Sequence, residues 1–442
     1  MKPAFIFTTV LYSVIVSFIS NSFVFFRHMP QSLLVIIPIF LFICIFAGVF
    51  TVKTRSTKIK ICCHGTVLLC SFYVSLIVSA VCQISLAIKA IPKDFMTLVW
   101  SLFLCIGVNF IVFWIGIICV YLTSVQLGIK MRVIGLACGM IPVANLVALA
   151  FIIKITAKEC LFEVEKERIN AQRSGERVCA AKYPILLVHG VFFRDTKFFN
   201  YWGRIPGELQ ANGAQIFYGN HPSAASVPES AEYIKTRIDE ILEQTGAAKV
   251  NIIAHSKGGL DCRYAISKLA IADRVASLTT VNTPHRGCLF ADHLLTIISP
   301  DIKNGVAKTY NLTLKKFGEA DADFLAAVND LTDESCRRLN SELTLPEGVF
   351  CQSVGSVMVR ATGGKFPLNF SYHLVKYFSG ENDGLVSEDS FSWGEKYTLL
   401  RASGKRGISH GDMIDLNREN ISGFDVREFY VNLVKDLKQR GL

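Results

Sequence analysis

Acidic side chains are almost absent from the first third of this 442-residue sequence. Residues 1–156 contain one of them, Asp94, beside eleven lysines and arginines, so this segment accounts for the whole formal net charge of +10. The rest of the chain holds 35 of the 46 basic and 35 of the 36 acidic residues, and is therefore neutral. Because a nucleic-acid-binding domain needs a basic excess on its folded part, the composition argues against a nucleic-acid partner.

The sequence also lacks the cysteine spacings of metal sites and redox centres. Six of its 14 cysteines follow residue 156, and they form no Cys-x-x-Cys pair. The other eight lie in or beside apolar segments, where cysteine is usually a small packing residue. We therefore expect no metal and no cofactor. A disulfide such as Cys336–Cys351 stays open, because spacing alone does not decide it.

Long apolar runs fill the first third of the chain. Five of them have the roughly 20 residues that a helix needs to cross a bilayer. Pro142 lies inside the last, where it predicts a kink or a re-entrant turn. These segments predict a transmembrane helical domain of about five helices over residues 1–156, with spans at Ala4–Phe26, Ser32–Val52, Thr66–Ile88, Met96–Ser124 and Val133–Ile153.

The basic residues between these segments predict their orientation. With five spans, seven basic residues fall on one side and four on the other, and the densest group lies between the second and third spans. The positive-inside rule then places the amino terminus in the cytoplasm. We expect a multi-pass protein of the cell membrane whose remaining part lies outside the cytoplasm.

The sequence pattern of the remaining residues predicts a linker followed by a globular domain. Residues 157–181 are charged and predict an exposed linker helix, and residues 182–442 alternate short apolar strands with amphipathic helices. This alternation predicts an α/β fold with a doubly wound, mostly parallel sheet. Strands are expected at residues 184–188, 215–218, 250–254, 277–281 and 349–354, and helices at 230–244, 260–269 and 425–438.

The segment Ala254–Gly259, with sequence AHSKGG, has the pattern of a nucleophile elbow. It joins a predicted strand to a predicted helix, with Ser256 at the apex and small residues two positions before and after it. Strand and helix nearly touch at such a turn, so the flanking positions, here Ala254 and Gly258, must be small. The pattern predicts that Ser256 is an acyl-transfer nucleophile, next to His255.

A serine nucleophile needs a general base and an acid that orients it. In doubly wound hydrolases both follow the serine, acid first. Two histidines come late enough: His410, in a loop of small residues, is the candidate base, and His373 reads as a packing residue. Asp383, followed by Gly384, is the candidate acid, with Glu381 and Asp412 as competitors.

The oxyanion of the reaction needs two backbone N–H donors. One is expected from Lys257, directly after the nucleophile. The loop after the first strand, with His189 and Gly190, offers a second donor at Val191. Gly190 gives this loop the conformational freedom to direct that N–H toward a substrate.

These motifs together resemble those of the bacterial true lipases, also called triacylglycerol lipases, of the α/β-hydrolase superfamily. The resemblance covers residues 182–442 and rests on Pro184–Gly190, Ala254–Gly259, Thr283–Gly287, Asn382–Val386 and His410–Asp412. It implies Ser256, Asp383 and His410 as the catalytic triad, and a lid at about residues 288–330. An alternative for that region is a helix packed permanently on the core.

One feature departs from that family. Many of its members hold a structural calcium ion between an aspartate upstream of the catalytic acid and the aspartate after the catalytic histidine. Asp412 matches the second, but residues 348–380 contain no acidic residue, so the first is missing. Calcium usually takes several oxygen ligands with more than one carboxylate. We therefore expect no calcium site of that type.

The sequence thus predicts a membrane-anchored serine ester hydrolase that acts on lipid or other acyl esters beside a bilayer. Two alternatives stay open. The same triad could serve an acyltransferase or a phospholipase-like lipid deacylase, which product analysis would separate. A transporter or sensor with a hydrolase-fold module is less well supported, because the apolar segments contain no acidic residue. The oligomeric state is left open.

Overall fold

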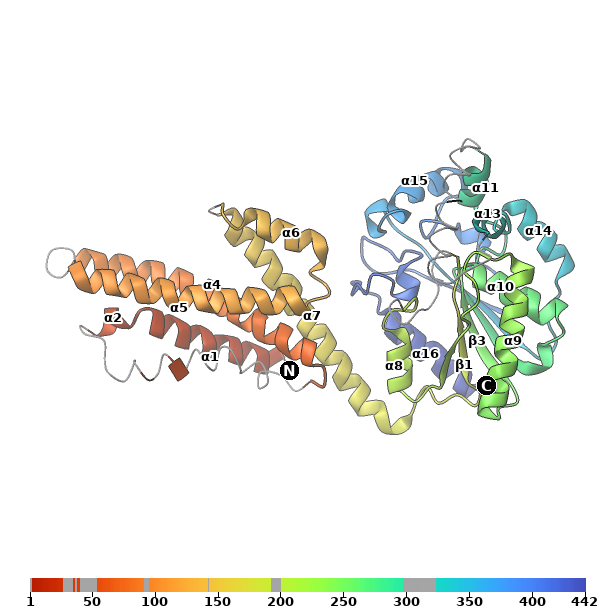
Figure 1. Ribbon diagram of the computed structural model, residues 1–442, viewed down its shortest axis with the longest axis horizontal. Coiled ribbons are helices and arrows are strands. Elements are labelled where there is room, and N and C mark those ends of the chain that lie inside the picture. The colour runs from red at the N-terminus through yellow and green to blue at the C-terminus, as the bar shows by residue number, and fades with distance from the viewer. Residues whose placement is uncertain are drawn as a thin grey trace. The chain divides into compact units, whose positions relative to one another are not determined.

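The computed structural model describes residues 2–26, 54–90, 95–141, 143–191, 200–296 and 323–442, with the single residues 35, 38, 39 and 308. The chain divides into two compact units, residues 1–172 and 173–442. The first is helical, and the second is built around a sheet (Figure 1). Each unit is described by itself.

The helices of the first unit follow the apolar runs of the sequence. Two of them are long and apolar enough to cross a membrane, over Thr57–Ile88 and Phe95–Thr123, and a shorter apolar helix covers Ala4–Ser20. The predicted span Ser32–Val52 lies almost entirely outside the described residues. The helices are α1 (Lys2–Ser20), α2 (Ser22–Phe25), α4 (Thr57–Ala90), α5 (Phe95–Thr123), α6 (Gly128–Cys138) and α7 (Ala144–Arg173).

The predicted fifth span, Val133–Ile153, is divided between two helices. Helix α6 ends at Cys138 and α7 begins at Ala144, on either side of Pro142. Proline has no N–H to donate and its ring clashes with the preceding turn, so the helix breaks there. Helix α7 then runs on to Arg173, through most of the stretch predicted as the linker helix.

Polar side chains connect the packed helices of the first unit. Asn21, between α1 and α2, donates from Nδ2 to the Ser79 hydroxyl of α4 at 2.8 Å. Gln83 of α4 donates to Asn21 Oδ1 at 3.1 Å and accepts a hydrogen bond from Ser101 of α5 at 2.9 Å. Such buried polar contacts fix the pairing of apolar helices, which otherwise have few directional interactions.

The second unit contains a six-stranded parallel sheet with the strand order β2-β1-β3-β4-β5-β6. The order reverses between β1 and β3, as a doubly wound sheet requires, so the predicted α/β fold class is confirmed. All five predicted strands are present. The strands are β1 (Ile185–Val188), β2 (Ile216–Tyr218), β3 (Val250–His255), β4 (Val275–Val281), β5 (Phe350–Ser356) and β6 (Lys396–Leu400).

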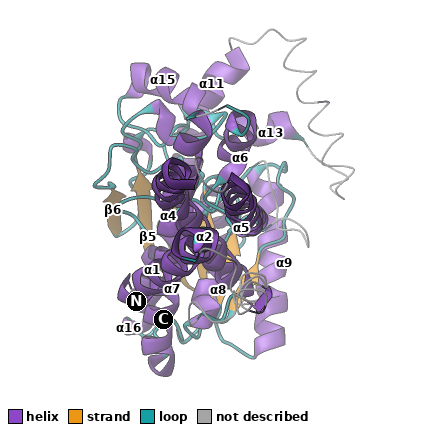
Figure 2. Ribbon diagram, turned by 90° about the vertical axis from the view of Figure 1, so that its left-hand side faces the viewer, coloured by secondary structure: helices purple, strands orange, loops and turns teal. Residues whose placement is uncertain are grey.

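Helices cover both faces of this sheet (Figures 1 and 2). On one face, Leu187 and Ile253 pack in a buried cluster with residues of α8 (Ile205–Ala211) and α16 (Val426–Gln439). On the other, Leu186 and Ile252 pack with residues of α9 (Val227–Thr245) and α10 (Lys257–Lys268). Neighbouring strand residues thus serve opposite faces, which explains why the strands are apolar throughout. The remaining helices are α11 (Leu289–Thr296), α13 (Phe324–Asn329), α14 (Asp333–Glu342) and α15 (Leu368–Ser379).

The predicted lid region, residues 288–330, is described only at its two ends. At these ends, α11 and α13 pack together: Cys288, Ala291, Phe324 and Val328 form one buried cluster with Val386 and Phe391. Residues 297–322, except 308, lie outside the described part of the chain, so the lid stays a prediction.

Candidate active site

Ser256 occupies a sharp turn between strand β3 and helix α10. Its φ of 56° and ψ of −131° lie in a region that side-chain-bearing residues rarely adopt. A Cβ atom at Gly258 would collide with the carbonyl oxygen of His189, and one at Gly190 would lie 2.8 Å from the Cβ of Ser256. The small residues at these positions therefore have a steric reason, because the first strand's loop and the elbow pass within contact distance.

His410 and Asp383 form a buried pair, as the sequence predicted for a base and its acid. The Nδ1 atom of His410 lies 2.6 Å from Asp383 Oδ2. The backbone N–H of His410 donates to the carbonyl oxygen of Asp383 at 2.9 Å, which ties the two loops together. The Asp383 side chain is fully buried. A buried carboxylate at this position selects the imidazole tautomer with its proton on Nδ1, which leaves Nε2 as the acceptor.

Three further donors hold the Asp383 carboxylate. Its Oδ1 accepts the backbone N–H groups of Leu385 at 2.9 Å and Val386 at 2.8 Å, and its Oδ2 accepts the side-chain amide of Asn282 at 2.6 Å. Together with His410, these donors satisfy a buried charge that would otherwise be costly. Asn282 directly precedes the Thr283–Gly287 motif, but no pattern in the sequence includes it.

Ser256 and His410 line the same cavity of about 310 Å³. Val191, one of the two expected oxyanion donors, and His255 also line it. The rest of the lining is mostly apolar and includes Pro284, Cys288, Val328, Leu331, Phe366, Leu368, Leu385, Val386, Ile414 and Leu416. The structure therefore brings the predicted nucleophile, base and oxyanion loop together at one apolar pocket.

Tyr201 connects the oxyanion loop to the base, and nothing in the sequence singled it out. Its hydroxyl accepts the backbone N–H of Gly190 at 3.0 Å and lies 2.8 Å from Nδ1 of His255, to which it donates. His255 then donates from Nε2 to the carbonyl oxygen of His410 at 3.2 Å. Burial holds the pKa of His255 well below its usual range, so the ring is neutral, as this pattern of donors requires.

The Lys257 side chain takes no part in lining the cavity. It is buried between helices α9 and α10, where its Nζ lies 2.6 Å from Asp261 and 3.1 Å from the Ser230 hydroxyl. Burial raises the pKa of Asp261 to about 7, and the Lys257 charge opposes that rise. The oxyanion prediction therefore concerns only the backbone N–H of Lys257, which lies at the first position of α10.

The competing candidates are placed differently. His373 is exposed on α15, so the expectation that it packs in the interior is wrong. Glu381 is half exposed and forms an ion pair with Arg401. That pair holds the pKa of Glu381 near 2. Cys336 and Cys351 are both free thiols, so the disulfide left open by the sequence is not formed.

Asp412, the aspartate that matches the calcium ligand of the resembling family, is paired with an arginine. Arg406 Nη1 lies 2.8 Å from Asp412 Oδ2, and Nη2 lies 3.1 Å from Oδ1. The Ser409 hydroxyl and N–H also donate to Oδ2. Because donors already cover both oxygens, and one of these donors is a cation, the residues around Asp412 do not fit a calcium ion.

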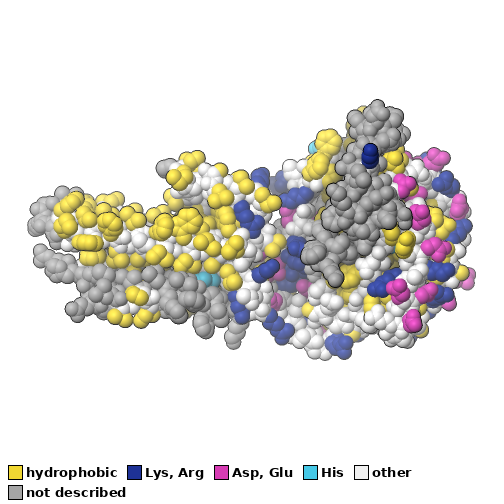
Figure 3. Space-filling model, in the orientation of Figure 1, with side chains coloured by type: hydrophobic (Ala, Val, Ile, Leu, Met, Phe, Trp, Pro, Cys, Tyr) yellow, Lys and Arg dark blue, Asp and Glu magenta, His cyan; other side chains and the backbone are white. Residues whose placement is uncertain are grey.

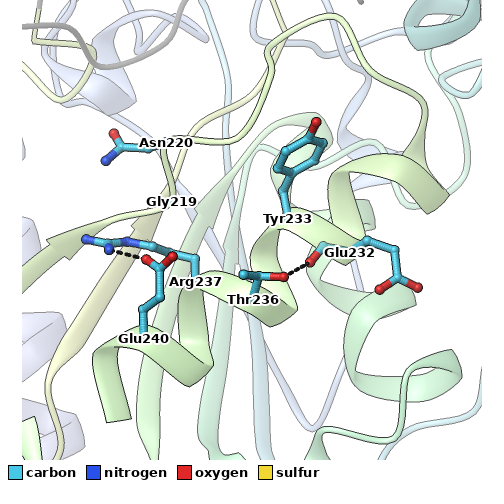
Figure 4. A pocket seen from close by; sticks show the side chains of 7 residues that line it. All are labelled: Gly219, Asn220, Glu232, Tyr233, Thr236, Arg237 and Glu240. Atoms are coloured by element: carbon cyan, nitrogen blue, oxygen red, sulfur yellow. Dashed lines mark hydrogen bonds and ion pairs between the residues drawn. The ribbon is translucent and has the colours of Figure 1, made fainter. Parts of the chain in front are cut away.

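A second hollow, of about 400 Å³, lies beside α9 and the end of β2 (Figure 4). Arg237, which lines this hollow, donates from Nε to the Tyr218 carbonyl at 3.0 Å and pairs with Glu240 at 2.7 Å. The Tyr233 side chain stands beside it and is half exposed. This hollow shares no lining residue with the cavity of Ser256 and His410, so we assign it no part in the chemistry.

Comparison with known proteins agrees with this architecture. The family model described as "alpha/beta hydrolase fold" matches residues 183–428. The chain is similar to a triacylglycerol lipase of Vibrio cholerae, with 31% identity over 59% of this chain and 89% of that protein. It is also similar to a triacylglycerol lipase of Burkholderia plantarii, with 35% identity over 36% of this chain. In that second case the chain spans about half of the relative's length (47%).

Among solved structures, the mature form of the lipase BlEst2 from Bacillus licheniformis is 21% identical, with a TM-score of 0.43, over 57% of this chain and 92% of that one. The family match covers more than half of the chain, and the Vibrio cholerae lipase aligns over most of its own length. This chain belongs to the alpha/beta hydrolase family, on the branch of the triacylglycerol lipases.

Proposed function

We propose that this protein is a serine ester hydrolase that cleaves acyl esters of lipids. The observation that carries the proposal is the buried Asp383–His410 pair beside a cavity that Ser256 enters from a strained turn. His410 takes the proton of Ser256 as its hydroxyl attacks the ester carbonyl, and then returns a proton to the departing alcohol. Water releases the acyl group from Ser256 by the same route, and Asp383 orients and stabilises the imidazolium in both steps.

The proposed oxyanion donors are the backbone N–H groups of Val191 and Lys257. Val191 lines the cavity, and the Tyr201 hydroxyl fixes the peptide of Gly190 beside it. Lys257 begins helix α10, whose first N–H groups have no partner within the helix and lie at the positive end of its dipole. Two such donors, already in place before the reaction, would stabilise the negative charge of the tetrahedral intermediate.

A lipid substrate is favoured by the surface beside the cavity. Phe366 lines the cavity and is 84% exposed, so it lies at the opening. On α15 next to it, Phe370 is 79% and Tyr377 84% exposed. Figure 3 shows hydrophobic side chains at the place that α15 occupies in Figure 1. Because residues 348–380 include basic but no acidic residues, this face suits an anionic lipid surface.

We further propose that the first unit anchors the protein in the cell membrane as a multi-pass helical domain. Helices α4 and α5 supply the length and hydropathy for two spans. Counted over five spans, the basic residues between the apolar segments favour an amino terminus in the cytoplasm, and an odd number of spans then places the hydrolase unit outside it. Anchoring would keep the cavity close to its lipid substrates.

A fluorophosphonate probe tests the enzymatic proposal directly. We expect one covalent adduct per chain, located by mass spectrometry on the peptide with Ser256. Incubation of the full-length protein with glycerides, phospholipids and short esters should then release free fatty acid. An acyl group that passes mainly to an added alcohol would instead indicate an acyltransferase, and the absence of both labelling and turnover would overturn the enzymatic proposal.

The exposed aromatic residues of α15 provide a test of the lipid preference. We expect the double variant Phe370→Ser/Tyr377→Ser to lose at least about thirtyfold in turnover of emulsified glycerides, because two aromatic side chains that each contribute about 1–3 kcal/mol at a lipid surface together contribute at least about 2 kcal/mol. Hydrolysis of a soluble p-nitrophenyl ester should stay within about twofold. Tyr233→Ser, which removes a half-exposed aromatic from α9, is the matched control. Equal losses on both substrates would contradict a lipid-facing role.

A further inference from the structure

We propose that Arg406 is a positioning residue for His410, and that its guanidinium serves as a built-in cation that fixes the base loop of this chain. The inference rests on the proposed function of His410, and it concerns Arg406, Asp412 and Glu419, which the proposed chemistry does not use directly. It begins from Asp412, which is almost fully buried two residues after His410.

The Asp412 carboxylate organises the loop from inside. Its Oδ2 accepts the backbone N–H of Ser409 at 2.8 Å and the Ser409 hydroxyl at 2.7 Å. The carboxylate thus connects the residue before His410 to Asp412, two residues after it. The backbone N–H of Asp412 returns a bond to the Ser409 carbonyl at 3.0 Å. These contacts close a tight turn with His410 inside it. The direction of the imidazole therefore depends on a buried negative charge.

Arg406 neutralises that charge in a two-pronged pair, with distances of 2.8 and 3.1 Å to the two carboxylate oxygens. Its Nη2 also donates to Glu419 at 2.8 Å, so one guanidinium bridges two carboxylates. Glu419 in turn lies 2.6 Å from the Nζ of Lys365, which lines the cavity. The chain itself therefore supplies the cation that the carboxylates of this loop bind. Arginine suits this position because its planar guanidinium binds a carboxylate through two hydrogen bonds, which a point charge cannot do.

The backbone around Arg406 is fixed independently of its side chain. The Arg406 carbonyl accepts the N–H of Val359 at 3.2 Å, and Met358 and Gly407 form an antiparallel bridge. Gly407 has a φ of 75°, and a Cβ atom there would collide with the Val359 nitrogen. A substitution of the Arg406 side chain therefore removes the cation while the strand-like contacts at Val359 persist.

The test compares full-length wild type with Arg406→Gln in EGTA, in calcium and in guanidinium chloride at tens of millimolar. For the variant in EGTA we expect kcat on a soluble ester to fall about ten- to a hundredfold, because a displacement of about 1 Å in a catalytic group has that effect, with KM nearly unchanged. Calcium or guanidinium should restore a large part of kcat and raise the melting temperature of the variant. Wild type should respond to neither, in activity or in melting temperature.

Two further variants keep the result interpretable. Arg401→Gln removes an exposed arginine that pairs with Glu381 and should leave kcat within about twofold, since exposed ion pairs contribute little. Asp412→Asn, which keeps the shape but not the charge, should lower kcat like Arg406→Gln and resist rescue. The inference is overturned if folded Arg406→Gln keeps full kcat in EGTA, if added cations rescue nothing, or if EGTA inactivates wild type. An inactive wild type would instead count against the proposed function.

Discussion

Ser256→Ala is expected to lower kcat for ester hydrolysis by at least about 10⁴-fold, the effect of removing the nucleophile from a serine triad. Alanine keeps the Cβ atom and the same backbone strain at φ 56°, so the turn between β3 and α10 should persist. What disappears is the hydroxyl that attacks the carbonyl and forms the acyl-enzyme. Residual activity would come from the oxyanion donors and from substrate binding alone.

The measurement is the steady-state hydrolysis of a soluble p-nitrophenyl ester, with covalent labelling by a fluorophosphonate as a second readout. Both should be lost together, while the thermal unfolding curve stays close to that of wild type. Ser341→Ala, which changes an exposed serine on α14, is a matched control and should keep full activity. If Ser256→Ala retained more than a few per cent of kcat, another nucleophile would have to be sought and the proposed mechanism abandoned.

The sheet could be predicted from the sequence because its strands are buried on both sides. Strands β1, β3 and β4 are buried at every position, and they appear as uninterrupted apolar runs bounded by turns. Strand β6 escaped prediction for the opposite reason. Lys396 and Tyr397 are exposed at the edge of the sheet, so residues 396–400 carry no apolar run.

The motif residues of the site were likewise visible, whereas the residues that support them were not. Ser256, Gly258, Asp383 and His410 stand in short local patterns that depend on turn geometry. Tyr201 contacts residues that are distant in the sequence, and Arg406 contacts residues across a loop, so their contacts leave no local pattern. The break between α6 and α7 could be predicted only in part. Pro142 indicated an interruption, whereas hydropathy alone indicated one continuous span.

Asp383→Asn should lower kcat about 10⁴-fold although it replaces one oxygen by nitrogen in a fully buried side chain. The backbone N–H groups of Leu385 and Val386 donate to Oδ1, so they hold an oxygen at that position. The new NH₂ group is then forced to the position of Oδ2, where it faces Nδ1 of His410. It can only donate, so the imidazole must carry its proton on Nε2. In that tautomer the ring cannot accept the proton of Ser256.

The control for Asp383→Asn is a substitution of the competing acid. Glu381→Gln changes the competing acid two residues earlier, which is half exposed and paired with Arg401, so its kcat should stay within about twofold. Asp383→Asn should still bind substrate, so KM should change far less than kcat. At higher pH its activity should recover in part, because hydroxide can assist a serine whose histidine no longer serves as base. If Glu381→Gln lowered kcat and Asp383→Asn did not, the acid would have to be reassigned to Glu381. His410 would then have to turn away from the Asp383 carboxylate, which lies 2.6 Å from its Nδ1.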